Sequence, residues 1–151
     1  MGSLGGTAST EIDAPIDACW AVVQDIASAP EWQDGLSAMD VRERDPRGRV
    51  AQAETTSEAK VRQIKSVVRF SYEEPRRVSW QQASGDLKRL DGAWELEALG
   101  PERTRATYHL DGDPGRVLGM LIRGPVEERL REILVAGRPM ELKRRVEGTR
   151  S

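Results

Sequence analysis

The sequence has little of the residue types that usually build reactive or metal-binding sites. It contains one cysteine and one histidine in 151 residues. A single cysteine, Cys19, excludes an internal disulfide framework and a cysteine-rich zinc site. The single histidine, His109, cannot form a multi-histidine metal site, and no His-Glu-x-x-His spacing occurs. We therefore expect neither a metal nor a cofactor.

Other absences bear on partners and location. Acidic and basic residues nearly cancel, leaving a net charge of -2, so no overall field draws the protein to nucleic acid or to an acidic membrane. No apolar run approaches the roughly 18 residues that span a bilayer. The first residues, MGSLGG, lack the basic and apolar segments of a secretory signal. We expect a cytoplasmic protein without nucleic-acid partners or membrane insertion, and its oligomeric state stays open.

What is present fits a single globular domain. The length of 151 residues allows one domain with a sizeable core. Hydrophobic residues make up 38% and charged residues 32%, a polar balance that does not imply disorder. We expect a flexible leader over residues 1–7 and one domain over residues 8–148.

The N-terminal part predicts a strand and two short helices. Residues 8–14 suit a short strand, which Pro15 ends. A second helix is expected over 28–35, with Ser28 as its cap and Gly35 as its stop. The first helix is indicated by apolar residues at spacings of three and four, namely Ile16, Cys19, Trp20, Val23 and Ile26.

The middle of the chain predicts consecutive antiparallel hairpins. Between the turn signals, apolar and polar residues alternate, so each strand has one dry and one wet face. Residues 49–59 are less decisive, because one face is small and the other polar. The turn signals lie at 45–48, 73–76, 84–86, 99–102 and 112–115. The dry faces hold Ile64, Val68, Phe70, Tyr72, Val78, Trp80, Leu90, Gly92, Trp94, Leu96, Ala106, Tyr108 and Leu110.

The same alternation, in which residues of one parity (all odd or all even numbers) share a strand face, also bears on the polar candidates. His109 falls on the wet face of its strand, which favours a solvent-facing residue over a catalytic one. Cys19 lies on the inner face of the first helix, which favours a small buried residue over a nucleophile. Glu43, Gln82 and Lys88 share parity with apolar neighbours. They either orient a ligand inside an apolar cavity or lie at strand ends, where the inner face meets water.

The C-terminal part predicts a long amphipathic helix over 126–147. Pro139 should kink or split it, and Gly148 is a natural stop. A sheet with one dry face needs a cover, and this helix is the long element available. Its apolar face holds Val126, Leu130, Ile133, Leu134 and Gly137.

Three stretches carry a resemblance to a known family. They are IDAPIDACWAVVQDIASAPEWQDG, LDGAWELEALGPERTRATYHLDGDPG and ELKRRVEG. In their order and spacing, the chain resembles the START-related (SRPBCC) superfamily, and in particular its polyketide cyclase/dehydrase-like branch. The resemblance implies an α+β helix-grip fold, a curved antiparallel sheet wrapped around a long C-terminal helix. It also implies a cavity between the sheet and the helix, which makes residues 8–148 a START-like ligand-binding domain.

The candidate site follows from this resemblance together with the shared parity. The resemblance places Trp32 on the second short helix, near the cavity mouth. The strand residues of the dry face and the helical stripe would line the cavity. No catalytic residue is assigned. The candidate ligand-binding residues are Trp32, Met39, Val41, Phe70, Tyr72, Trp80, Gln82, Lys88, Trp94, Tyr108, Leu130 and Leu134.

Two classes of function stay open, with a weaker third. The first is a module that binds or transports a hydrophobic or aromatic small molecule, lipid- or polyketide-like. The second is a cyclase/dehydrase-type enzyme that acts on a polyketide-like substrate by acid/base catalysis. The sequence favours the first, because an enzyme of that kind needs a titratable group inside the cavity and His109 does not point there. The third is a regulatory protein that binds a protein partner.

Overall fold

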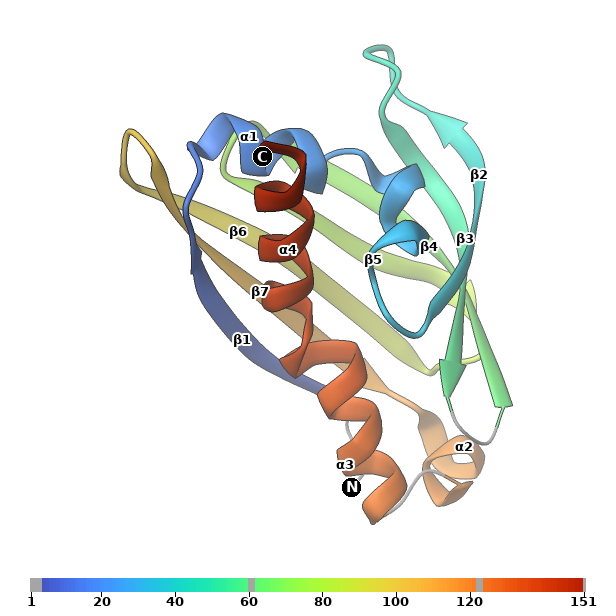
Figure 1. Cartoon of the computed structure of the whole chain (residues 1–151). Coiled ribbons are helices and arrows are strands. Elements are labelled where there is room, and N and C mark those ends of the chain that lie inside the picture. Colours follow the sequence, from blue (N-terminus) through green and yellow to red (C-terminus); the bar gives the residue numbers. More distant parts are fainter. Residues whose placement is uncertain (1–3, 60–61, 122–123, 151) are drawn as a thin grey trace.

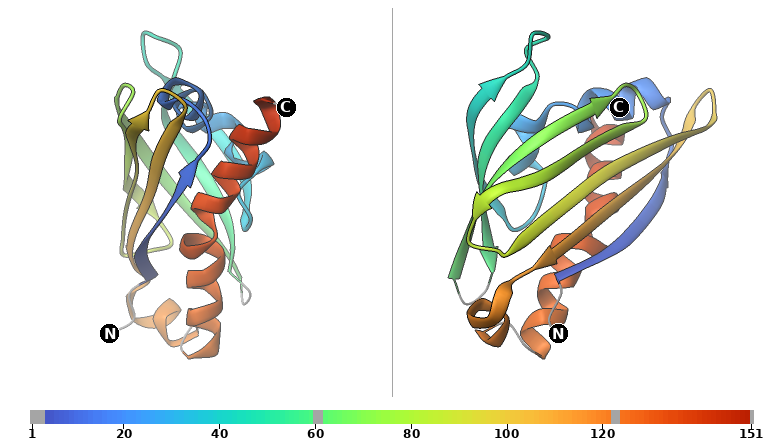
Figure 2. Two further views of the ribbon diagram at one scale, coloured as in Figure 1. Left: turned by 60° about the vertical axis from the view of Figure 1, so that its left-hand side comes forward. Right: turned by 180° about the vertical axis from the view of Figure 1, so that it is seen from behind.

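A curved antiparallel sheet with a helical layer on its concave face makes up the fold (Figure 1). The structure is a computed structural model and describes residues 4–59, 62–121 and 124–150. In that part of the chain the sheet has seven strands in the order β1-β7-β6-β5-β4-β3-β2. The sheet wraps around the C-terminal helices, which the turned views show from both sides (Figure 2). The expected helix-grip fold is therefore confirmed.

The elements follow the order that the sequence predicts. The strands are β1 (Leu4–Ile12), β2 (Leu36–Arg44), β3 (Val50–Ala59), β4 (Arg62–Glu73), β5 (Arg77–Gly85), β6 (Arg89–Gly100) and β7 (Arg103–Asp113). The N-terminal helices are α1 (Ile16–Val23) and the 3-10 helix η1 (Ile26–Glu31). The C-terminal helices are α2 (Gly115–Leu121), α3 (Pro125–Arg131), the π-helical turn η2 (Glu132–Ala136) and α4 (Arg138–Arg150).

The alternation of apolar residues correctly predicts which side of the central strands faces the helices. Val78 lies opposite Trp94 on the neighbouring strand, and Trp94 lies opposite Tyr108. Trp80 lies opposite Gly92. Because directly opposed residues project to the same face of a sheet, these side chains share the concave side. The turn signals at 45–48, 73–76, 84–86 and 99–102 each join antiparallel neighbours.

The first strand begins earlier than the sequence predicts. Strand β1 starts at Leu4 and pairs with β7 from Leu4 opposite Gly112 to Ile12 opposite Thr104. Residues 4–7, which were expected to form a flexible leader, therefore belong to the sheet. The rest of that leader, residues 1–3, lies outside the described residues. The two consecutive glycines, Gly5 and Gly6, weaken the strand signal here, and the pairing with β7 supplies what local preference does not.

The second short helix also differs from its prediction. It is a 3-10 helix that begins at Ile26, and the Ser28 hydroxyl donates to the Asp25 carbonyl at 2.8 Å. Ser28 is thus an interior residue of this turn and not its cap. Gly35 follows with φ at +82°, a conformation that favours glycine, and it directs the chain into β2.

The long C-terminal helix is interrupted one turn before Pro139. The Gly137 amide donates to the Glu132 carbonyl at 3.0 Å, the five-residue spacing of a π turn. Pro139 lies in the first turn of α4, where a missing amide hydrogen costs nothing. The expected break is real, but the π turn makes it. This turn adds a residue to the helical path and so changes which side chain of the next turn faces the sheet.

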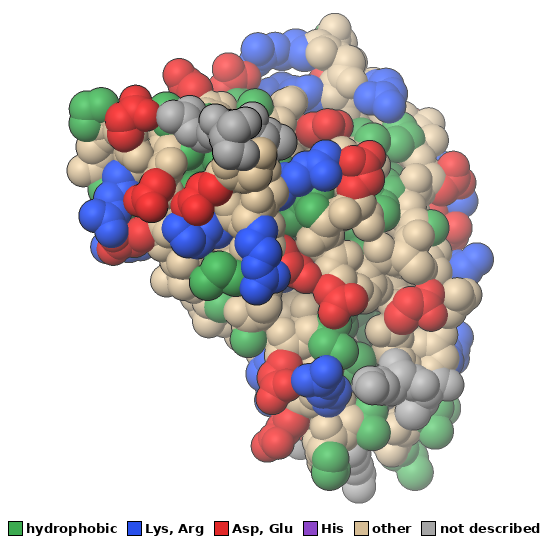
Figure 3. Space-filling view, viewed as in Figure 1, with side chains coloured by type: hydrophobic (Ala, Val, Ile, Leu, Met, Phe, Trp, Pro, Cys, Tyr) green, Lys and Arg blue, Asp and Glu red, His purple; other side chains and the backbone are tan. Residues whose placement is uncertain are grey.

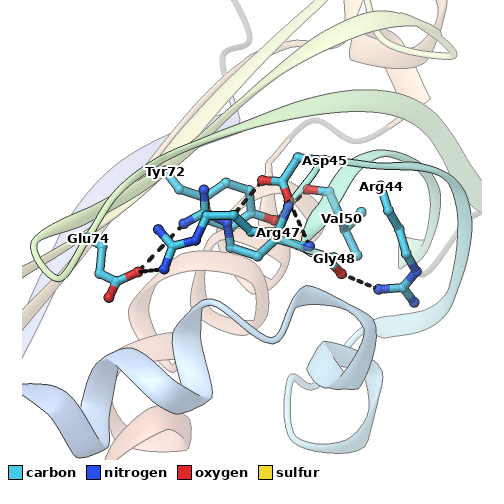
Figure 4. Close-up of polar contacts among 8 residues, drawn as sticks. Arg44, Asp45, Arg47, Gly48, Val50, Tyr72 and Glu74 are labelled. Carbon is cyan, nitrogen blue, oxygen red and sulfur yellow. Dashed lines mark hydrogen bonds and ion pairs between the residues drawn. The ribbon is translucent and has the colours of Figure 1, made fainter.

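The β2–β3 hairpin is fastened to β4 by a polar cluster (Figure 4). Asp45 accepts hydrogen bonds from the Arg47 and Arg49 amides, both at 2.9 Å. The Arg49 guanidinium lies 4.3 Å from the centre of the Tyr72 ring, and the Tyr72 hydroxyl donates to the Val50 carbonyl. Burial, the largest influence, raises the pKa of Tyr72 to about 12. Tyr72 is therefore a structural residue of this hairpin.

The surface carries charges of both signs. Acidic and basic side chains intermingle over the face that carries α4 (Figure 3). Among the described residues, no helix combines the length and the apolar character that a bilayer-spanning segment needs.

Candidate functional site

A cavity lies between the concave face of the sheet and the helices. It has a volume of about 120 Å³. A single buried water needs roughly 10–15 Å³, so this space can hold a small organic molecule or its ring system. The lining residues are Val23, Ile26, Ala29, Trp32, Gln33, Leu36, Met39, Thr55, Ser57, Ile64, Ser66, Val68, Phe70, Trp80, Leu87, Leu90, Trp94, Tyr108, Leu110, Leu134 and Arg138.

Five aromatic side chains form one continuous wall. Trp94 lies between Trp32, at 6.1 Å between ring centres, and Tyr108, at 4.7 Å. Trp80 lies between Tyr108, at 5.7 Å, and Phe70, at 6.2 Å. The rings are tilted toward one another, the geometry in which aromatic pairs attract. The wall presents flat apolar surface to the cavity.

The position of Trp80 depends on a glycine. A Cβ atom at Gly92 would lie 2.4 Å from three atoms of the Trp80 indole, far inside van der Waals contact. The indole therefore lies directly over the β6 backbone, in space that any side chain at position 92 would occupy. The absence of a side chain at Gly92 thus leaves the room that the Trp80 ring occupies against the sheet.

Arg138 is the charged residue of the lining. It is 3% exposed. Its Nη1 donates to the Asp34 carbonyl at 2.6 Å and to Glu141 Oε1 at 2.9 Å. Glu141 Oε2 in turn accepts from the Asp34 amide at 2.8 Å. A buried cation needs such partners, and here they come from α4 itself and from the loop after η1.

Two donors on this side of the cavity have no partner. Trp32 Nε1 and Arg138 Nε are both buried and make no hydrogen bond. Buried polar groups in folded proteins are nearly always paired, so each exception needs a physical explanation.

Tyr108 adds a hydroxyl next to Arg138. Burial raises the pKa of Tyr108 above 10.0, and the charge and hydrogen bond of Arg138, which act in the opposite direction, do not offset it. The phenol therefore stays protonated at neutral pH and can act as a hydrogen-bond donor.

The sheet side of the cavity also carries hydroxyl groups, which come from β3 and β4. Odd-numbered residues of β3 face inward, since Thr55 lies opposite Ser66. The Thr55 hydroxyl donates to the Ser66 carbonyl at 3.2 Å, and the Ser66 hydroxyl donates to Gln82 Oε1 at 2.7 Å. Gln82 Nε2 then donates to the Leu87 carbonyl at 2.9 Å. These groups are satisfied within the protein.

Comparison with known proteins identifies the family. The family described as "Polyketide cyclase / dehydrase and lipid transport" matches residues 12–137, most of the chain. The chain belongs to this family. Among curated proteins, none matches the sequence of this member of the polyketide cyclase/dehydrase and lipid transport family.

Solved structures share the fold of this family member. A START superfamily protein from Mycobacterium smegmatis is 19% identical, with a TM-score of 0.81 over 98% of this chain and 99% of that one. A protein from Thermus thermophilus is 19% identical, with a TM-score of 0.80 over 99% of this chain and 100% of that one. The Zhui aromatase/cyclase from a Streptomyces species is 16% identical, with a TM-score of 0.74 over 99% of this chain and 97% of that one.

The structure brings most of the candidate residues of this family member together. Those that line the cavity are Trp32, Met39, Phe70, Trp80, Trp94, Tyr108 and Leu134. Those that do not line it are Val41, Tyr72, Gln82, Lys88 and Leu130.

The candidate residues that do not line the cavity are kept out of it for different physical reasons. Val41 lies opposite Ala53, on the same face as Met39, and packs against the main apolar core without lining the cavity. The register of β2 shifts after Val41, and Glu43 beyond the shift is exposed. Lys88 lies in the turn before β6, where its amide donates to the Asp113 carbonyl and its side chain is exposed. Leu130 is fully buried, in a second apolar cluster around α2 and α3.

Tyr72 and Gln82 have structural roles. The Tyr72 hydroxyl donates to the Val50 carbonyl, in the β2–β3 hairpin cluster. The Gln82 side chain is on the cavity face of the sheet, opposite Val68, but its amide is bonded to Ser66 and Leu87 and is not part of the lining. Of the two positions that the sequence allows for Glu43 and Lys88, the structure has the exposed one near a strand end, so Lys88 is not a ligand-binding residue of this cavity. Gln82 supports the wall without lining it.

Sequence reasoning missed Arg138 and the polar residues of β3 and β4. Arg138 stands between Gly137 and Pro139, at a helix interruption, and a basic residue there usually faces solvent. The inward hydroxyls follow only once the β3 register is known, because Thr55 and Ser57 alternate with equally polar neighbours.

His109 lies on the opposite face of the sheet from the cavity. Its Nδ1 is 3.1 Å from the Thr7 hydroxyl and its Nε2 is 2.6 Å from Glu95 Oε1. Cys19 is fully buried in the main apolar core. Among the described residues, no three His, Cys, Asp or Glu side chains are grouped so as to hold a metal ion.

Proposed function

We propose that the protein binds or transports a hydrophobic or aromatic small molecule, lipid- or polyketide-like, in the cavity. The observation that carries this proposal is the continuous wall of Trp32, Trp94, Tyr108, Trp80 and Phe70 facing an internal space. Apolar enclosure with a few polar groups is the usual design of a small-molecule site. Membership of a family described by both cyclase/dehydrase activity and lipid transport supports the same proposal.

The alternative is a cyclase/dehydrase-type enzyme acting on a polyketide-like substrate by acid/base catalysis. The likeness to the Zhui aromatase/cyclase favours it. Of the cavity-lining residues that the structure describes, Tyr108 and Arg138 are the titratable ones. Burial raises the pKa of Tyr108, so its phenol keeps its proton at neutral pH, and the guanidinium of Arg138 offers hydrogen-bond donors and no acceptor. A cavity with two donors and no described base suits binding better than proton abstraction.

Two substitutions on opposite faces of the sheet test the binding proposal. Trp80→Ala should weaken binding of the neutral probe β-ethylnaphthalene by about tenfold or more, because it removes a wall of the cavity. His109→Ala, on the outer face, is the matched control and should leave probe binding unchanged. Isothermal titration calorimetry measures both affinities. Equal affinities in all three proteins would contradict the proposed site.

A further measurement separates the alternatives. A native mass spectrum of freshly purified protein should show one small molecule retained per chain. On the enzyme alternative, Tyr108→Phe would abolish turnover of a polyketide-like substrate while the probe still binds. Turnover by the unmodified protein would favour the enzyme over the carrier.

A further inference from the structure

We infer that Arg138 and Trp32 form a specificity site that selects ligands with a neutral acceptor oxygen, such as a ketone or quinone carbonyl, over ligands with a carboxylate. The inference deepens the proposed function and rests on it. It assigns to two named side chains the choice among hydrophobic molecules that the cavity could otherwise enclose equally well.

The first observation is the pair of unpaired donors. Trp32 Nε1 and Arg138 Nε are buried without a hydrogen bond, and both residues line the cavity. Neither atom is in contact with solvent, so bulk water does not supply the missing acceptor. A ligand oxygen can supply it, after a local side-chain rearrangement that the new hydrogen bonds offset. A hydrogen bond formed there stabilises the complex more than the hydrogen bond to water that the ligand gives up. The reason is that it also removes the free-energy cost of leaving a buried donor unpaired.

The second observation is the charge balance around Arg138. Glu141 Oε1 already accepts from Arg138 Nη1 at 2.9 Å, and the two side chains are only 4% and 13% exposed. The other oxygen of Glu141 is held by the Asp34 amide at 2.8 Å. Glu141 is thus fixed in place and cannot swing away to leave Arg138 for another anion. The pair is neutral as it stands.

The consequence is a preference among ligand groups. A carboxylate brought to this wall would leave a net negative charge in apolar surroundings, where burying an unbalanced charge is costly. A carbonyl oxygen supplies the acceptor without the charge. The hydroxyls of Thr55 and Ser66 already donate to protein oxygens, so they compete weakly for it, whereas the Tyr108 hydroxyl lies beside Arg138 and belongs to the same donor group. The rest of the lining is largely aromatic and aliphatic, which suits a ring system bearing one carbonyl.

Three probes that differ in one substituent test the preference. They are the β-isomers of ethylnaphthalene, acetylnaphthalene and naphthoate, titrated at neutral pH by calorimetry. The ketone should bind about tenfold more tightly than the hydrocarbon, and more tightly than the carboxylate by a larger factor. In an apolar cavity without accessible donors, the hydrocarbon would bind more tightly than the ketone, because the ketone must give up its hydrogen bond to water.

Variants assign the preference to the two residues. Trp32→Phe keeps an aromatic ring and deletes the Nε1 donor but leaves Arg138 Nε, so the ketone-to-hydrocarbon affinity ratio should fall from about ten to about three. Arg138→Lys keeps the charge and the partner Glu141 but removes Nε, and it should lower the same ratio. Trp80→Phe is the matched control, since it trims a cavity-wall indole whose nitrogen is not an unpaired buried donor. It should weaken both probes and leave the ratio unchanged.

The outcomes separate this inference from the proposed function. If ethylnaphthalene does not bind, the proposed function fails and the inference fails with it. If ethylnaphthalene binds but the ketone has no advantage, or the naphthoate binds best, the proposed function stands and the inference is overturned. Where Arg138→Lys does not fold, as judged by circular dichroism, the ratio in Trp32→Phe decides alone. An unchanged ratio in that variant contradicts the inference.

Discussion

Replacing Gly92 with alanine should lower the affinity for an aromatic probe by more than about tenfold and the free energy of unfolding by about 1–3 kcal/mol. The new methyl group would lie 2.4 Å from the Trp80 indole, so the ring must leave its position over β6. Tyr108 and Phe70 flank Trp80 on its own face, so the displaced ring moves toward the cavity and fills part of it. Probe titration and urea denaturation measure the two effects.

Gly100→Ala is the matched control for this change. Gly100 ends the same strand, and a Cβ atom there has nothing within 4 Å. It should leave affinity and stability close to those of the unmodified protein. If Gly92→Ala and Gly100→Ala behaved alike, Trp80 would not be held over Gly92 as described.

The second large effect is expected at Trp94. Trp94→Ala should lower the free energy of unfolding by about 3–5 kcal/mol, the usual cost of deleting a buried aromatic side chain. Trp94 is 2% exposed and lies in contact with both Trp32 and Tyr108. A loss of that size is a large part of the roughly 5–15 kcal/mol that stabilises most domains, so chemical denaturation should show it clearly.

Leu99→Ala provides the comparison in the same strand. Leu99 is a large apolar residue that is 39% exposed at the end of β6. Its removal should change the free energy of unfolding by about 0.5 kcal/mol or less. A cost for Trp94→Ala as small as that for Leu99→Ala would mean that Trp94 is not part of the packed core.

These predictions depend on strand faces that could be predicted from the sequence. In the central strands, alternation placed Trp80, Trp94 and Tyr108 on one face, and their pairing agrees. The reason is physical: a side-chain period of two tolerates no slip where one face is buried. The turns were equally clear, because glycine, proline and aspartate favour few backbone conformations.

Alternation failed where a strand is irregular. In β2 alternation holds through Met39 and Val41, but the register then shifts before Glu43, and such a bulge changes the face of the residues beyond it. Nothing in the local sequence marks the shift. The orientation of Lys88 failed for a related reason, since the strand begins one residue later, at Arg89.

The polar part of the site could not be predicted because it depends on the π turn. The helical stripe that includes Leu130, Leu134 and Gly137 assumes an uninterrupted α-helix. The turn over Glu132–Ala136 inserts an extra residue, so Arg138 comes to line the cavity. Such a change of phase arises from packing against the sheet and has no sequence signal of its own.

The most direct test of the account is an NMR titration that follows the indole N–H signals of the four tryptophans. Trp32, Trp80 and Trp94 line the cavity, whereas Trp20 is buried in the main core and does not line it. Addition of β-acetylnaphthalene to isotope-labelled protein should shift the three cavity signals, saturate at one probe per chain and leave the Trp20 signal in place. Shifts at Trp20 alone, or at none of the four under saturating probe, would contradict the claim that this cavity is the ligand site.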